Sequence, residues 1–267
     1  MSHERELEAA REAAARAGRE IMTLYADFEA IAQAPGNITT EADHRAQEII
    51  LHFLHAAFPE DAFIAEEPTA TLTTVPRSGP RLWVIDPIDG TRGFARKNGE
   101  FSVMIGLVEA GAAVLGVVWE PARERWTWAV RGQGCWRADG GAAAVPCKVS
   151  AVDRPEQATL VQSRADRKTA EHSPIRLARR LYTYSAGIKL ALVARGEADV
   201  YVSTYTQFNA WDLCAGQVLV EAAGGQVTDR HGRPIHYAPD GRGHIDGVIA
   251  SNGLLHTFAR SALLRSG

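Results

Sequence analysis

Acidic side chains are concentrated in four short stretches of the sequence, and their spacing could support metal chemistry. The stretches are Thr40-Glu41-Ala42-Asp43, Glu66-Glu67, Asp86-Pro87-Ile88-Asp89-Gly90-Thr91 and Trp211-Asp212. In the third stretch, two aspartates stand three positions apart, directly after the apolar run 82–85, which predicts a buried strand. Carboxylates gathered at the end of a buried strand are costly unless a cation neutralises them. This stretch therefore indicates a cation site.

The chemistry of such a site follows from the ligand type. Oxygen-only ligands favour a hard cation such as Mg²⁺, which seldom takes all its ligands from protein and so leaves room for water and phosphate. The hydroxyl of Thr91 could orient one such water, and Gly90 allows the backbone to approach a ligand closely. A helix that starts at Gly90-Thr91 would present free N–H groups to a phosphate. The residues alone therefore support metal-assisted hydrolysis of a phosphate ester.

Most of these acids also have an interpretation that involves no catalysis. Thr40 and Asp43 have the spacing of a capping box at the start of a helix. Glu66-Glu67 could be a solvated pair in a loop, and Asp212 could cap the helix that follows it.

Composition and charge exclude several classes of protein. The chain has 267 residues, a formal net charge of −3, 46% apolar and 23% charged residues, which is typical of a globular protein. The charge gives no footprint for a nucleic acid polymer. No run of about 18 apolar residues predicts a membrane span, and residues 1–25 lack the apolar core of a signal peptide. Cys135, Cys147 and Cys214 form no CxxC pair, so we expect neither a disulfide nor a zinc site, and a cytoplasmic location.

Hydrophobic periodicity predicts a helix-rich start, an antiparallel meander and an alternating second half. We expect helices over residues 7–24, 43–57, 168–181, 188–194 and 213–223. Strands are expected over residues 82–85, 159–162, 198–203 and 247–250, with the meander over 101–137 and a mobile loop over 68–80. A break near Ser150 would divide the chain into an N-terminal lobe, 1–150, that carries most of the acids and an α/β lobe, 151–267.

The four acidic stretches together resemble the motifs of the inositol monophosphatase family, which belongs to the lithium-sensitive, Mg²⁺-dependent phosphatase superfamily. The first match is Thr39-Thr40-Glu41-Ala42-Asp43 and the last is Trp211-Asp212-Leu213-Cys214-Ala215-Gly216. Four motifs in the right order make the resemblance specific, and it runs from about residue 7 to residue 253. It implies an α/β (α+β) fold, the layered α-β-α-β-α sandwich of the inositol monophosphatase/fructose-1,6-bisphosphatase type, with metals between two lobes.

The resemblance also assigns roles to individual residues, with two or three Mg²⁺ ions as cofactors. The implied metal ligands are Glu66, Glu67, Asp86, the carbonyl of Ile88, Asp89 and Asp212. Asp89 would be shared by two metals, and Glu67 would contact a third through water. Asp43, Thr91 and Glu66 are the implied catalytic residues, of which Asp43 and Thr91 would polarise the attacking water.

Within the superfamily, the residues around these motifs are most similar to bacterial 3′(2′),5′-bisphosphate nucleotidases. The similarity lies in Thr91–Val103, Ser163-Arg164, Ile188-Lys189-Leu190 and Phe208–Asp212. It implies in-line attack of a metal-activated water on the 3′-phosphate of 3′-phosphoadenosine 5′-phosphate, without a covalent intermediate. The implied substrate-binding residues are Gly90, Thr91, Ser163, Lys189 and Asn209.

Several positions depart from the expected patterns, and two of them bear on the substrate. Tyr205 stands where inositol phosphatases typically place a glutamate for inositol hydroxyls, and Ala186 replaces a serine of the nucleotidase branch. Lys189 itself could be a solvated surface cation.

Three functions stay open: a bisphosphate nucleotidase, a phosphatase for inositol or another sugar or alcohol phosphate, and a non-catalytic ligand-binding protein. The presence of every expected acid disfavours the third. The expected partner is a small phosphorylated metabolite, with no nucleic acid polymer and no membrane. Family members often form homodimers, so the resemblance also allows a homodimer.

Overall fold

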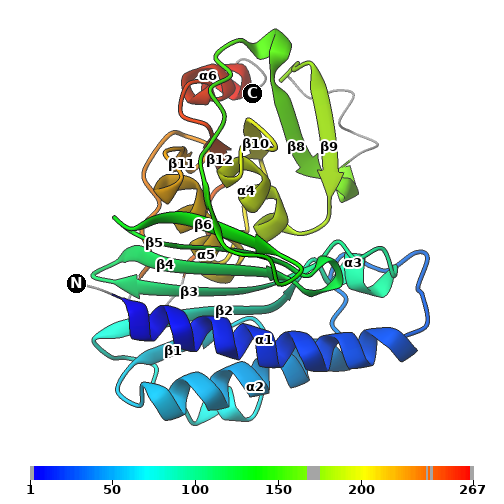
Figure 1. The fold of residues 1–267 in the computed structure, drawn as a ribbon, viewed down its shortest axis with the longest axis vertical. Coiled ribbons are helices and arrows are strands. Elements are labelled where there is room, and N and C mark those ends of the chain that lie inside the picture. The colour runs from blue at the N-terminus through cyan, green and yellow to red at the C-terminus, as the bar shows by residue number, and fades with distance from the viewer. Residues whose placement is uncertain (1–2, 167–174, 239, 241–242, 265–267) are drawn as a thin grey trace.

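The computed structural model describes residues 3–166, 175–238, 240 and 243–264. The described residues form five layers, as Figure 1 shows. Helices α1 (Glu4–Asp27) and α2 (Glu41–Ala57) cover one face of a seven-stranded sheet, and α4 (Ala186–Ala194) and α5 (Ala210–Ala222) lie between this sheet and a second, five-stranded one. Helix α6 (His256–Leu264) packs on the outer face of the second sheet. The predicted α-β-α-β-α sandwich is confirmed.

The first sheet has its strands in chain order, β1-β2-β3-β4-β5-β6-β7. All neighbours are antiparallel except β1 and β2, which are parallel. The strands are β1 (Ala62–Ala65), β2 (Arg81–Asp89), β3 (Ser102–Glu109), β4 (Ala112–Glu120), β5 (Arg125–Val130), β6 (Gly134–Asp139) and β7 (Val145–Cys147). The predicted meander is therefore confirmed as β3 to β6.

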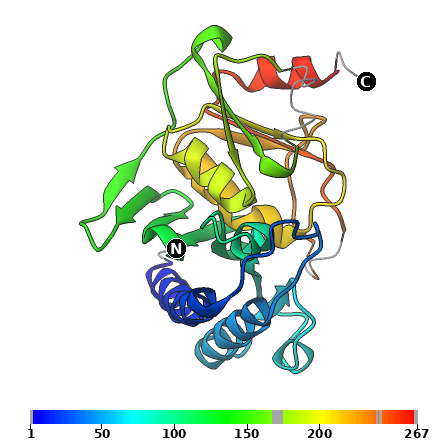
Figure 2. The same ribbon diagram turned by 90° about the vertical axis from the view of Figure 1, so that its right-hand side faces the viewer.

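The second sheet has the order β11-β12-β10-β8-β9 and mixes parallel and antiparallel pairs. Its strands are β8 (Thr159–Ser163), β9 (Arg179–Thr183), β10 (Val200–Ser203), β11 (Gln226–Thr228) and β12 (Val248–Ser251). In Figure 2, turned by 90°, α4 and α5 lie between the second sheet, above them, and the two N-terminal helices, below them. The boundary between the sheets lies between β7 and β8, and the division into lobes at residue 150 stays a prediction.

Three local expectations were wrong. A helix was expected over 168–181, but the end of this segment belongs to strand β9. Residues 167–174 lie outside the described part of the chain. The loop 68–80 is anchored rather than merely mobile, because Leu72 and Val75 are buried in the core beside the short 3₁₀ turn Thr71–Thr73. Strand β2 does not stop before Pro87 but continues to Asp89.

Helix α5 packs unusually close to the first sheet, since two glycines face it. A Cβ atom on Gly116 of β4 would lie 2.2 Å from the carbonyl oxygen of Ala215, and one on Gly106 of β3 would lie 2.5 Å from the Sγ atom of Cys214. Cys214 is therefore a packed side chain at this contact, and its thiol is buried. Cys135 and Cys147, distant in sequence, lie opposite each other on β6 and β7 as free, buried thiols.

Replacing Gly116 tests this close approach. In Gly116→Ala the added methyl group meets backbone that cannot move aside alone, so we expect the free energy of unfolding to fall by about 1–3 kcal/mol. Gly36→Ala is the control, because nothing lies within 4 Å of the added atom. Thermal or urea denaturation measures both, and an equal stability of the two variants would contradict the close contact.

Candidate active site

The predicted site residues converge on one cavity of about 610 Å³ between the first sheet and the start of α4 and α5. Those that line it are Glu66, Glu67, Asp86, Ile88, Asp89, Gly90, Thr91, Ser163, Lys189, Asn209 and Asp212. Asp43 is fully buried behind the lining and reaches the cavity through Thr91. The structure thus brings together all twelve residues, which come from segments spread over most of the chain, and their individual roles stay predictions.

A bulge in β2 places both aspartates of the Asp-x-x-Asp stretch on one face of the sheet. Asp86 pairs with Met104 and Asp89 with Ser102, so three steps along β2 match two steps along β3. Residues two apart on a strand share a face, and cross-strand partners point the same way. The extra residue in β2 therefore turns Asp89 to the same side as Asp86. Pro87, which has no N–H to donate, lies within this irregular stretch.

Asp89 is held by the N-terminus of α4. The backbone N–H groups of Ala186 and Gly187 donate to its carboxylate at 3.0 and 2.6 Å, and the Ser185 hydroxyl donates to it as well. Ser102 Oγ lies 3.4 Å from Asp89 Oδ2 and 3.0 Å from Ser185 Oγ. A carboxylate at a helix N-terminus accepts orphan N–H groups and is favoured by the helix dipole. Asp89 thereby joins β2 to a helix almost a hundred residues further along the chain.

Asp43 and Thr91 form the second arm of the site. Thr40 caps α2 reciprocally with Asp43, whose Oδ2 atom accepts hydrogen bonds from the Thr40 N–H at 2.8 Å and the Thr40 hydroxyl at 2.6 Å. The Thr91 hydroxyl lies 3.1 Å from Asp43 Oδ1 and 3.0 Å from the carbonyl oxygen of Ile88. The capping interpretation of Asp43 and its place in the site are therefore both correct, because its two oxygens serve different partners.

The glutamates lie after β1 at the mouth of the cavity. Glu67 is buried, its Oε1 accepts from the Thr39 hydroxyl at 3.2 Å, and its backbone is held by both ends of the Gln47 amide. Glu66 is exposed to the cavity and shares a hydrogen bond with Asp86. The pair is therefore not a solvated loop pair, since one member is fixed and the other faces the remaining acids.

Asp212 begins the third arm, in the first turn of α5. Asn209 caps this helix, and its backbone N–H donates to Asp212 Oδ2 at 2.6 Å. The buried ammonium of Lys189 lies close enough to favour the charged form of Asp212. Asp212 and Asn209 line the cavity that Asp89 and Asp86 also line. Lys189 is not a solvated surface cation, as only 2% of it is exposed.

Crowding of these acids raises their pKa values. Burial is the first cause for each, and neighbouring carboxylates add to it. The pKa of Asp43 rises to about 6, that of Asp212 to about 7 and that of Glu66 to about 8, while that of Asp86 rises well above its ordinary value. A raised pKa shows that the protein does not fully balance the negative charge of the carboxylate, and a cation could balance it.

The donor set fits a hard divalent cation. Within the described ranges, no three acidic, histidine or cysteine side chains stand ready as a closed metal site. Yet Asp86 Oδ1 is buried without a hydrogen-bond partner, and the Glu66 and Asp86 carboxyl groups share a hydrogen bond. Oxygen donors of this kind, with the cavity open beside them, suit Mg²⁺ with water and phosphate as its further ligands.

Gly90 and Ser163 complete the predicted set. Gly90 has φ = +90° and precedes α3 (Thr91–Ala95), and a Cβ atom there would lie 2.7 Å from the carbonyl oxygen of Glu100. Only glycine fits this position without strain. Ser163, at the end of β8, accepts a hydrogen bond from the Ala165 N–H at 3.2 Å and keeps its side chain at the cavity.

Sequence reasoning missed four residues that shape the site. Ser102 and Ser185 orient Asp89, and Arg92 and Tyr184 line the cavity beside Thr91 and Lys189. The signal for Ser185 was an N-cap serine directly before the apolar residues of α4. Nothing in the sequence could have linked Tyr184 to Arg92, because they meet only through the fold.

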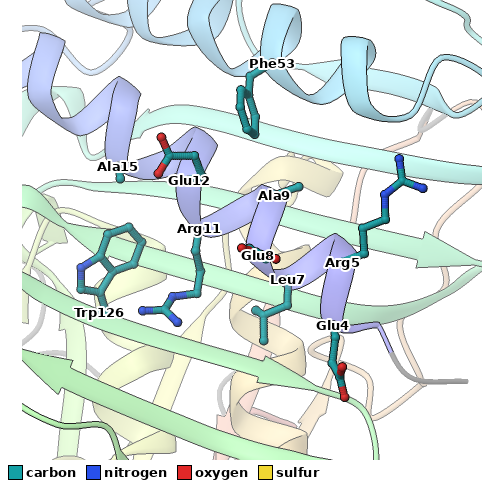
Figure 3. A pocket seen from close by; sticks show the side chains of 10 residues that line it. All are labelled: Glu4, Arg5, Leu7, Glu8, Ala9, Arg11, Glu12, Ala15, Phe53 and Trp126. Atoms are coloured by element: carbon teal, nitrogen blue, oxygen red, sulfur yellow. The ribbon is translucent and has the colours of Figure 1, made fainter.

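A second groove, of about 690 Å³, runs along α1 and contains none of the predicted site residues (Figure 3). Its walls include Arg11, Phe53 and Trp126, with the Arg11 guanidinium 5.6 Å from the Trp126 ring. Its acids, Glu4, Glu8 and Glu12, all stand along α1, and Glu12 pairs with Arg16. The acids from separate segments of the chain converge instead at the first cavity, which we call the carboxylate cavity.

The raised pKa values predict how stability depends on pH in the absence of divalent cations. Above about pH 4 the folded protein keeps protons that the unfolded chain has lost, so its free energy of unfolding falls as the pH rises through about 8. Glu66→Gln removes one such group and should reduce this fall. Melting temperatures in excess chelator at pH 5 and pH 8 measure it.

Glu29→Gln, at an exposed loop position, is the control and should follow the parent protein. An unchanged pH dependence in Glu66→Gln would contradict the crowding of these carboxylates.

Comparison with known proteins agrees with this geometry. A sequence model of the inositol monophosphatase family matches residues 3–263. The 3′(2′),5′-bisphosphate nucleotidase CysQ of Escherichia coli K12 is 31% identical over 230 residues, 85% of this chain and 91% of that protein. A fructose-1,6-bisphosphatase/inositol-1-monophosphatase of Thermotoga maritima is 32% identical over 226 residues, 82% of this chain and 80% of that protein. The solved Thermotoga maritima IMPase has a TM-score of 0.80 at 29% identity, covering 97% of both chains.

These similarities extend over nearly the whole chain and include every segment that contributes to the carboxylate cavity. The match in sequence and the match in fold agree with the geometry described above. The chain belongs to the inositol monophosphatase family.

Proposed function

We propose that this phosphatase removes the 3′-phosphate from 3′-phosphoadenosine 5′-phosphate, giving AMP and phosphate, with bound Mg²⁺ as cofactor. The observation that carries the proposal is the lining of the carboxylate cavity. It combines the acids with two cationic side chains, Arg92 and Lys189, and with Tyr205, which is 58% exposed. Carboxylates with metal suit the phosphate that is transferred, while separate cations suit a second phosphate.

The metal ligands in this proposal are Glu66, Glu67, Asp86, the Ile88 carbonyl, Asp89 and Asp212. When bound, Mg²⁺ supplies a water of lowered pKa and positive charge beside the phosphate. Lithium inhibition is part of the same proposal, as the family resemblance implies. The orphaned Asp86 Oδ1 and the shared hydrogen bond between Glu66 and Asp86 support the assignment of this ligand set.

Thr91 orients the attacking water in this mechanism. Its hydroxyl has one proton and two acceptors within reach, Asp43 Oδ1 and the Ile88 carbonyl oxygen. With that proton engaged, the Thr91 oxygen can only accept a hydrogen bond from a water. A lone pair of that water is then free to face the phosphorus. Asp43, fully buried, fixes the direction of the hydroxyl, and the N–H groups that follow Gly90 lie beside the phosphate.

Tyr205 and Lys189 are the features of this cavity that bear on the substrate. The Tyr205 ring meets Phe208 edge-on at 5.2 Å, which holds it upright at the rim and leaves a face for a flat base. Lys189 adds positive charge at the cavity wall, next to Asp212. Neither residue offers a carboxylate for the hydroxyl groups of inositol.

A phosphatase for inositol or another sugar phosphate is the second candidate. The Thermotoga maritima enzyme named for fructose 1,6-bisphosphate and inositol 1-phosphate is as similar to this chain as the nucleotidase is. A Mycobacterium tuberculosis histidinol-phosphatase is 32% identical over 223 residues. Overall similarity therefore favours neither substrate class, and the cavity lining has to decide.

Asp89→Asn tests the metal mechanism. The amide keeps the size of the side chain but loses the charge that two metals would share, so kcat should fall by at least about a hundredfold. The variant should still show a cooperative melting transition, although at a lower temperature in chelator, because the amide nitrogen replaces one of the two oxygens that accept from α4. Excess EDTA should abolish the parent activity. Asp27→Asn, at the exposed end of α1, is the control. Near-normal turnover in Asp89→Asn, or full activity in EDTA, would refute the ligand assignment.

A panel of substrates tests the substrate class. Phosphate release from 3′-phosphoadenosine 5′-phosphate should show a higher kcat/KM than release from inositol 1-phosphate, fructose 1,6-bisphosphate, histidinol phosphate or 5′-AMP. Lys189→Ala should lower kcat/KM for bisphosphates and monophosphates alike, because its ammonium binds the carbonyl oxygens of Thr183 and Tyr184 and supports the charge of Asp212. If inositol 1-phosphate is the better substrate, the second candidate replaces the first.

A further inference from the structure

The two cations of the carboxylate cavity are bound in very different ways. Lys189 is buried, and its Nζ atom donates to the carbonyl oxygens of Thr183 and Tyr184 at 3.3 and 2.8 Å. Its charge also acts on Asp212. Most of the N–H donors of the Lys189 ammonium are therefore used by the protein itself. Through them, Lys189 joins the end of β9 to α4.

Arg92, in contrast, keeps its donors. Its Nε atom is buried and has no hydrogen-bond partner, and no carboxylate of the described residues lies in ion-pair distance of its guanidinium. Its guanidinium lies 5.3 Å from the centre of the Tyr184 ring. A guanidinium over an aromatic ring is attracted by the ring face and can still donate its N–H groups to a ligand.

Arg164, by comparison, is an arginine whose donors are used by the protein itself. Arg164 directs two nitrogens at the Glu100 carboxylate, one of them at 2.7 Å, and donates to the Tyr182 carbonyl oxygen at 2.8 Å. It therefore fastens β8 and β9 to the segment after α3. Arg92 lines the cavity without any such partner, although a buried N–H without an acceptor is costly.

We propose that Arg92, which lies over the Tyr184 ring, binds the second phosphate of a bisphosphorylated substrate and so determines the preference for bisphosphates over monophosphates. The inference rests on the proposed function and adds to it a residue that faces the non-reacting end of the substrate. A guanidinium can hold two phosphate oxygens at once, which a point-charge ammonium cannot. In the proposed function, metal ions held by the acids would bind the phosphate that is cleaved, so a separate cation is needed for the other phosphate.

The test compares two substrates that differ only in the second phosphate, namely 3′-phosphoadenosine 5′-phosphate and adenosine 3′-phosphate. In the Mg²⁺-loaded parent enzyme the ratio of kcat/KM values should favour the bisphosphate. In Arg92→Ala this ratio should fall by at least about tenfold, mainly through a higher KM for the bisphosphate. Arg92→Lys keeps the charge but not the fork, so its ratio should lie between those of the parent and Arg92→Ala.

Arg96→Ala is the matched control. Arg96 also approaches the Tyr184 ring, at 5.8 Å, but it is exposed and is not part of the cavity lining. Its loss should leave the ratio within about twofold of the parent. Melting temperatures of all variants check that the fold is intact, and Arg92→Lys keeps the test decisive if Arg92→Ala is unstable.

The outcomes separate this inference from the proposed function. If Arg92→Ala slows both nucleotides equally, Arg92 serves the cleaved phosphate or the fold, and the inference is overturned while the nucleotidase proposal stands. A parent enzyme that hydrolyses both nucleotides equally well overturns it too. If the parent hydrolyses neither, the nucleotidase proposal fails, and fructose 1,6-bisphosphate against fructose 1-phosphate replaces the nucleotide pair. The same fall in ratio then supports Arg92, and an unchanged ratio overturns it.

Discussion

Mutual repulsion of carboxylates is the constraint on which the rest of this structure depends, because six acids must share one cavity and still let the chain fold. The fold offsets the repulsion separately for several of them. Asp43 and Asp212 accept hydrogen bonds at the starts of α2 and α5, and Asp89 accepts them at the start of α4. Each of the three helix N-termini therefore holds one carboxylate of this cluster, and the helix dipoles stabilise negative charge there. Glu66 and Asp86 have no such helix N-terminus, and the pKa of each is raised by burial and by neighbouring carboxylates.

The arrangement explains why the cavity lies between the two sheets. Asp89 belongs to the first sheet, but the donors that hold it belong to α4, which leads into the second. Gly187 makes this contact possible, because a Cβ atom there would lie 2.9 Å from Ser102 Oγ and 2.8 Å from the Met104 sulfur. The same carboxylate that a metal would share thus also positions the second half of the chain against the first. Folding and metal binding therefore depend on a common contact.

Much of this could be predicted from the sequence, and the exceptions have physical reasons. The long periodic helices α1, α2 and α5 and the meander were predicted because one face of each is apolar over many residues. Strand β9 reads Arg-Arg-Leu-Tyr-Thr at an edge of its sheet, where exposed polar residues hide a strand. The continuation of β2 beyond residue 85 could not be predicted, because a proline argues against the interior of a strand, whereas its missing N–H is harmless at an irregular position. The acids could be predicted because they belong to motifs with a fixed spacing. Tyr184 could not be predicted, because only the fold brings it into contact with Arg92.

The distinction between the two cavity cations carries the argument about substrate choice one step further. A buried lysine whose ammonium faces two carbonyl oxygens is the kind of contact that stabilises the end of a strand, and its nearness to Asp212 adds electrostatic support for that acid. Lys189 can thus be needed by enzymes of this fold whatever their substrate. Arg92 stabilises nothing comparable, since its Nε has no acceptor and its counterpart is an aromatic face. A cation that the fold does not use is free to vary with the ligand, and specificity is more easily encoded in such a residue than in one that the metal site also requires.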